Sequence, residues 1–178
     1  DSSMPAYHSA FNKKGEYKTL GNLAVLPIHG SRGPAPPLAD PEQMDIVDEA
    51  LYYFRANVLF RTFEVQGDAD RVLVYVTLFA SQCLQEVAQN RCEVKADVQK
   101  VLRQLGGASA FALPGDAGFP VSAIISCSSS EREPMRQYLK QLRAVTAERL
   151  YDRLINEDGT VNKWWLSFAK RKFMGKSL

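Results

Sequence analysis

The sequence predicts an all-α fold of about five helices, in which one central helix is surrounded by the others, with irregular or short β segments. Two observations lead to this prediction. Apolar residues recur at the spacing of an α-helix in most of the chain. The 178 residues, with 46% hydrophobic and 24% charged side chains, are also typical of a soluble globular protein with a real core. We therefore expect one helical domain over residues 1–178, with an extended N-terminal arm over about residues 1–39.

The arm contains two segments of different composition. Residues 20–28 (LGNLAVLPI) form a short apolar run that suits a strand or a packed arm. Residues 30–37 (GSRGPAPP) follow, and their prolines and glycines disfavour a regular helix. We therefore expect the arm to be mostly extended up to the first helix.

The strongest helical pattern lies between Asp40 and Phe63. Asp40 can cap a helix, Pro41 suits the first helical position, and Gln43 stands where a capping-box partner belongs. An apolar stripe at i, i+4, i+7 and i+11 consists of Val47, Leu51, Phe54 and Val58. A second row beside it consists of Ile46, Ala50, Tyr53 and Asn57. Because more than half of the circumference is apolar, we expect this helix to be the central one, with the stripe in the core.

Further helices are expected in the middle of the chain. Gly67 breaks the chain, and Asp68 can cap a second helix that extends to Asn90. Part of this segment (VLVYVTLF) favours a strand by propensity, but the helical period persists for longer than a usual strand. A shorter helix is expected from Val94 to Leu105, where the glycine pair at 106–107 ends it.

The last third of the chain alternates between turns and helices. Residues 114–120 have the composition of turns, and residues 121–127 (VSAIISC) suit a strand. A fourth helix is expected from the segment SSSEREP at 128–134 to about Leu154. After a turn at 156–160, the last helix begins near Asn162.

The three cysteines give information about the compartment. Cys83, Cys92 and Cys127 are odd in number and show no metal-binding spacing, so we expect free thiols in a reducing compartment. No apolar run approaches the roughly 20 residues that a membrane span requires. The sequence therefore predicts no membrane span.

Residues with catalytic or ligand-binding potential are few. His8 and His29 have no cysteine or carboxylate partners at metal-binding spacing, and the glycine-rich segments match no phosphate-binding motif. Asp45, Asp48 and Glu49 are grouped carboxylates that could form an acid–base pair, but a solvated face near the helix N-terminus explains them more simply. We therefore expect no enzyme activity, no cofactor and no metal.

Positive charge is concentrated at the C-terminus. Residues 160–178 contain five basic residues and no acidic one, and subtracting them from the net charge of +2 leaves −3 for the rest of the chain. Large aromatic residues lie between these charges, which leaves three interpretations open. Trp164, Phe168 and one more aromatic can close the core while the lysines solvate the other face. The segment can also be a protein interface, or a surface for nucleic acid or anionic membrane. The candidate partner-binding residues are Lys163, Trp165, Lys170, Arg171 and Lys172.

Several irregular segments resemble one known family in the same order along nearly the whole chain. They are MPAYHS (4–9), LGNLAVLPI (20–28), GPAP (33–36), DIVDEALYYF (45–54), Pro-Gly (114–115), GFP (118–120), KWW (163–165), Phe-Met (173–174) and KSL (176–178). The family is subunit 3, the 21-kDa subunit, of the actin-related protein 2/3 complex. Residues 91–105 and 126–133 match no fixed pattern of this family.

The resemblance implies a function. It implies a helical fold and membership of the seven-subunit assembly that nucleates branched actin filaments. It also implies a non-catalytic structural role, docking mainly on one actin-related protein, with the actin filament as a further candidate partner. The expected location is the cytoplasm, at cortical actin structures of the cytoskeleton, with no nucleic acid bound. The alternative is a stand-alone adaptor that binds acidic lipid or nucleic acid through a basic C-terminal helix.

Overall fold

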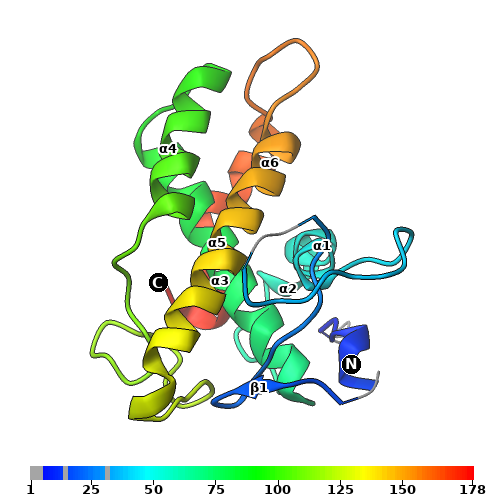
Figure 1. The fold of residues 1–178 in the computed structure, drawn as a ribbon. Coiled ribbons are helices and arrows are strands. Elements are labelled where there is room, and N and C mark those ends of the chain that lie inside the picture. Colours follow the sequence, from blue (N-terminus) through cyan, green and yellow to red (C-terminus); the bar gives the residue numbers. More distant parts are fainter. Residues whose placement is uncertain (1–5, 14–15, 31–32) are drawn as a thin grey trace, which may run out of the picture.

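The long helices α3 (Asp68–Gln89) and α5 (Arg132–Leu154) pack against each other and against α4 (Lys95–Gly107), as Figure 1 shows. The computed structural model describes residues 6–13, 16–30 and 33–178. Parts of the predicted arm, namely 1–5, 14–15 and 31–32, lie outside the described residues. The described chain is mostly helical, with one two-stranded sheet. None of its helices has both the length and the apolar composition needed to cross a bilayer.

Helix α3 is buried along most of its length. Fifteen of its 22 residues are buried, and it contacts α1, α4, α5, α6 and the small sheet. Part of this segment favours a strand by propensity, but its helical period predicted a helix up to about residue 90. That prediction is confirmed. Its start differs from the prediction. Gly67 is the N-cap in extended conformation, and Asp68 is already the first helical residue.

The segment at residues 40–63 is not one long helix, so that prediction is wrong. It forms α1 (Ile46–Tyr52) and the single turn α2 (Phe54–Asn57). The cap is Asp45 instead of Asp40. Its carboxylate accepts the Asp48 N–H at 2.9 Å, and the Asp48 carboxylate accepts the Asp45 N–H at 3.2 Å. This reciprocal box fixes the helix start five residues later than expected, and residue 53 then leaves the helical conformation with ψ near 2°.

The apolar stripe of this segment nevertheless lies in the core, as predicted. Val47, Leu51, Phe54 and Val58 are each at most 1% exposed. The break between α1 and α2 therefore changes the backbone path without turning the stripe to solvent.

A small hairpin follows the first part of the arm. Strands β1 (Thr19–Leu20) and β2 (Leu23–Ala24) pair antiparallel, and the next apolar residues of the run are buried. Gly21 in its turn has φ +54°, and a Cβ there would lie 1.9 Å from the Ser126 carbonyl oxygen. The turn thus packs directly on residues 121–127.

The segment at residues 121–127 consists of turns and irregular backbone, so the predicted strand is wrong. The side-chain oxygen of Asn22 accepts the Ser126 N–H at 2.9 Å and so satisfies a polar group of this irregular segment.

Buried polar side chains hold the N-terminal arm to α1, α2 and α3. Asp70, fully buried, accepts the Ser9 N–H at 2.8 Å and contacts His8 Nδ1 at 2.6 Å. Glu49, 3% exposed, accepts the Ser9 hydroxyl at 2.7 Å. Asn57 exchanges two hydrogen bonds with the backbone of residue 7, at 2.9 and 3.0 Å. The interpretation of residues 45–49 as a solvated carboxylate face is therefore wrong for Glu49, which is a buried anchor, and for Asp45, which is also buried.

Helices α4 and α5 form an antiparallel pair. The start of α4 lies beside the loop after α5, where Val94 and Thr160 form an antiparallel bridge. At the other end a Cβ on Gly106 would lie 2.8 Å from the Ala147 Cβ, so glycine permits the close approach. The predicted helices at 94–105 and 128–154 are confirmed, except that the glycine pair lies inside α4 and Ala108 is its C-cap.

Candidate docking surface

The C-terminal segment forms short helical turns instead of one long helix. Asn162 caps α6 (Lys163–Leu166), and its side-chain oxygen accepts the N–H groups of Trp164 and Trp165 at 3.1 Å each. The 3₁₀ turns η3 (Ser167–Lys170) and η4 (Phe173–Gly175) follow. The predicted helix start near Asn162 is confirmed, but the α-helix is only one turn long.

Backbone contacts fix this segment to the rest of the molecule. The Met174 N–H donates to the Phe60 carbonyl at 3.0 Å, just after α2. The Ser81 hydroxyl on α3 donates to the Arg171 carbonyl at 3.3 Å. Because the backbone makes these contacts, the neighbouring basic side chains remain available to other molecules.

Three aromatic rings of the tail close the core. Trp165 lies 5.9 Å from the buried Phe54 ring in a near-parallel stack, and Phe168 meets the same ring edge-on at 6.4 Å. Phe173 is 1% exposed and contacts Phe63 at 5.7 Å. The interpretation that tail aromatics close the core is therefore confirmed for these rings. Trp165, a candidate partner-binding residue, is half-buried in this packing.

Trp164 lies on the surface, contrary to the interpretation that placed it in the core. It is 49% exposed, and the Arg55 guanidinium lies 4.6 Å from its ring centroid. This cation–π contact and an edge-on contact with Phe168 at 5.3 Å hold the ring in one orientation. The candidate partner-binding residues predicted from the sequence included neither Trp164 nor Arg55. The adjacent tryptophans were the available signal, because neighbouring helix positions do not face the same side.

The four basic candidates all lie at the surface. Lys163, Lys170, Arg171 and Lys172 are exposed, and none forms an ion pair with another residue in the described ranges. Together with Arg55 and Trp164 they form what we call the basic tail surface. It combines exposed basic side chains of the tail with an exposed tryptophan ring that contacts Arg55.

A second cluster resembles a metal site but already contains a guanidinium. Donor atoms of His29, Asp45 and Asp48 lie within 4.8 Å of one another. The Arg149 guanidinium lies between the two carboxylates, at 2.6 Å from Asp45 and 3.1 Å from Asp48. The Nε2 atom of His29 is 2.6 Å from the Gln43 carbonyl oxygen. A cation there would meet the guanidinium, so the cluster is a structural ion pair network.

The same contacts decide the ionisation of Asp45. Burial opposes the charged form, but the hydrogen bonds from Arg149 and from two backbone N–H groups outweigh it and lower the pKa of this carboxyl. An acid–base pair needs carboxyls with separated pKa values, one of them raised by an apolar environment. This lowered pKa instead makes Asp45 a stable anionic partner for Arg149.

The chain is similar to known proteins over nearly its whole length. A family model described as P21-Arc, the ARP2/3 complex ARPC3 (21 kDa) subunit, matches residues 4–178. Actin-related protein 2/3 complex subunit 3 of Schizosaccharomyces pombe is 45% identical over 179 residues, covering 98% of this chain and all of the relative. The subunit of the same name from Dictyostelium discoideum is 41% identical, covering 97% and 99% of the two chains. That from Arabidopsis thaliana is 40% identical, covering 94% and 96%. The resemblance seen in the sequence is thereby confirmed, and the chain belongs to the P21-Arc family of 21-kDa ARP2/3 complex subunits.

Proposed function

We propose that this chain is a non-catalytic structural subunit of the actin-related protein 2/3 complex and contributes to the nucleation of branched actin filaments. We further propose that it docks on one of the actin-related proteins through the basic tail surface. Family membership over residues 4–178 supports the first part, since the three relatives described above are each named as subunit 3 of that complex. The stand-alone adaptor is not favoured, because nearly the whole chain matches a complex subunit.

The observation that carries the docking proposal is the exposed Trp164 with Arg55 on its ring, in a tail whose exposed basic residues form no ion pair within the described ranges. We expect an actin-type partner to present an acidic surface, to which exposed basic side chains would be complementary. Tryptophan and arginine are the residues that most often anchor protein interfaces. Trp164 and Arg55 are already held together at 4.6 Å, so binding would order little that is not ordered in the free chain. The surrounding lysines would then mainly accelerate association.

The proposal also includes the wider setting of the subunit. The chain forms one helical domain. Because fifteen of the 22 residues of α3 are buried, α3 is the helix that the others surround, in place of the segment at residues 40–63 expected from the sequence. It acts in the cytoplasm, in the actin cytoskeleton and at cortical actin structures, and the actin filament is a further partner. Fluorescence localisation of the tagged subunit together with a second complex subunit would test the cortical placement, and uniform signal would contradict it.

Substitution of Trp164 tests the docking surface. Trp164→Ala should weaken incorporation of the subunit into the complex on the order of tenfold or more, because an interface anchor is removed. The cation–π contact with Arg55 contributes only about 0.5–1 kcal/mol to the fold, so the fold should survive. Val94→Ala is the matched control, since Val94 is 53% exposed and lies outside the tail.

Incorporation is measured by reconstitution of the complex and size-exclusion chromatography, with circular dichroism as the fold check. Wild-type incorporation by a folded Trp164→Ala subunit would contradict the docking surface. A wild-type subunit that remains outside the complex would contradict the structural role itself.

A further inference from the structure

We propose that the groove between α4 and α5 receives an α-helix from another subunit of the complex, with an acidic side chain over Arg103 and basic side chains over Glu148 and Asp152. This inference rests on the proposed function in one respect, because it takes the helix to come from another subunit of that complex. The groove and the basic tail surface consist of different residues, and they require partners of different chemistry.

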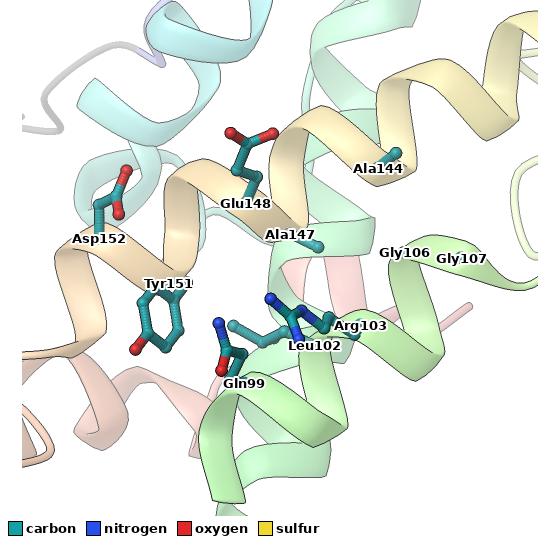
Figure 2. A pocket seen from close by; sticks show the side chains of 10 residues that line it. All are labelled: Gln99, Leu102, Arg103, Gly106, Gly107, Ala144, Ala147, Glu148, Tyr151 and Asp152. Carbon is teal, nitrogen blue, oxygen red and sulfur yellow. The ribbon is translucent and has the colours of Figure 1, made fainter. Parts of the chain in front are cut away.

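The groove is an open hollow of about 520 Å³ along the pair of antiparallel helices. Figure 2 shows Gln99, Leu102 and Arg103 on α4 and Glu148, Tyr151 and Asp152 on α5 around it. Its lining combines apolar surface with side chains that can form hydrogen bonds or ion pairs. Such a mixture suits a protein segment that brings both apolar and charged groups.

Small residues keep the hollow open. Gly107 and Ala144 line it and are exposed, and a Cβ on Gly107 would meet no atom within 4 Å. Next to them, Gly106 and Ala147 are in close contact and hold the two helices together. A ridge of side chains from a third helix can therefore enter the hollow, as ridges enter grooves in ordinary helix packing.

The two walls carry opposite charge, which specifies the occupant. Arg103 on α4 and Glu148 and Asp152 on α5 are exposed, and none of them forms an ion pair with a residue in the described ranges. Figure 2 shows Glu148 and Asp152 projecting from the same side of α5, with the Arg103 side chain between the two helices. The acidic wall disfavours nucleic acid and anionic lipid, while the basic wall accepts a carboxylate.

The spacing of the acidic wall favours a helix as the occupant. Glu148 and Asp152 are four residues apart on α5, so their Cβ atoms are separated by about 5–6 Å. Basic residues at i and i+4 on a partner helix have the same separation. A helix that lies along the groove can therefore pair both carboxylates while its apolar row enters the hollow.

Zero-length crosslinking of the reconstituted complex tests the inference. A carbodiimide joins carboxylates to lysines in direct contact, so Glu148 or Asp152 should crosslink to a lysine within a helix of another subunit. Filling the groove with Gly107→Leu and Ala144→Leu should reduce this crosslink at least about tenfold. Reversing the wall with Glu148→Lys and Asp152→Lys should reduce incorporation of the subunit by a similar factor.

Matched controls keep the test specific. Gln104→Leu adds the same side chain to the exposed face of α4 outside the groove, and Glu42→Lys with Glu64→Lys makes the same charge change elsewhere. Both controls should behave as wild type. Circular dichroism confirms that each variant is folded, and Leu should be tolerated at position 107 because the space is open.

Three results would overturn the inference. They are a wild-type complex without any crosslink from the acidic wall, a crosslink to a second copy of this chain, and a crosslink to a lysine outside a helix. Co-purification of the wild-type subunit with the complex is scored separately, so failure of the groove and failure of the proposed function are distinguishable.

Discussion

The buried carboxylate of Asp70 should be one of the most sensitive polar positions in the protein. It accepts the N–H groups of Ser9 at 2.8 Å and Gln66 at 3.0 Å, and it contacts His8 at 2.6 Å. In Asp70→Ala, the two backbone donors lose their partner, at a cost of about 1–3 kcal/mol each. We therefore expect the variant to lose about 2–6 kcal/mol of unfolding free energy from these two donors together.

The same helix offers a matched control two residues away. Asp68 is 50% exposed at its side chain and pairs with Arg71 at the surface, so Asp68→Ala should cost no more than about 1 kcal/mol. Urea unfolding of both variants gives the comparison, and hydrogen exchange at residues 7–12 should accelerate in Asp70→Ala alone. A cost below about 1 kcal/mol for Asp70→Ala, or equal costs for the two variants, would refute the anchoring role.

Three further predictions concern the core, the hairpin and pH. Leu51→Ala should cost about 2–5 kcal/mol in urea unfolding, because Leu51 is 1% exposed and its removal leaves a cavity; a loss under about 0.5 kcal/mol would contradict burial of the stripe. Gly21→Ala should cost about 1–3 kcal/mol, since its Cβ would clash with the Ser126 carbonyl at a positive φ, and unchanged thermal stability would contradict the close approach. The pKa of Asp45 is lowered by Arg149, so its contribution to stability is present above the ordinary carboxyl pKa and is lost as the pH falls through the lowered value. The stability difference between wild type and Asp45→Asn should therefore shrink below about pH 4, and a constant difference down to pH 2 would contradict this.

Much of the helical fold could be predicted because apolar periodicity depends only on which face is buried. The Val47 stripe is in the core even though its helix is broken, and α3 was correctly chosen as a helix against its strand propensity. Period and length were decisive there, because a strand of that length would be unusual.

Helix boundaries could not be predicted in the same way, because competing local and distant contacts decide them. Asp40 and Asp45 are both acceptable caps, and each has a possible capping-box partner three residues later, Gln43 and Asp48; the helix forms from the Asp45–Asp48 box. The break at Tyr53 accompanies its 4.5 Å stack on Tyr7, a residue of the arm far away in sequence. Local sequence contains no information on such a contact.

The candidate site was only partly predictable for a related reason. Charge could be assigned to the surface, and the four basic residues predicted as partner-binding are exposed. The choice between Trp164 and Trp165 depends on where Phe54 and Arg55 lie, about 110 residues earlier in the chain. The groove between α4 and α5 depends on the close approach at Gly106, which appears in sequence only as a helix-ending glycine pair.

The association rate of the subunit with the rest of the complex, measured across salt concentrations, tests the docking proposal most directly. The variant carries Lys170→Glu, Arg171→Glu and Lys172→Glu, and the control reverses three exposed lysines elsewhere, namely Lys18, Lys95 and Lys100. Exposed charges at an interface mainly affect the rate of association and its dependence on salt. We predict that the tail variant associates more slowly than both wild type and control at low salt, that its rate depends on salt differently, and that branch formation slows with it. Equal rates for all three proteins at every salt concentration would contradict the basic tail surface as the docking site.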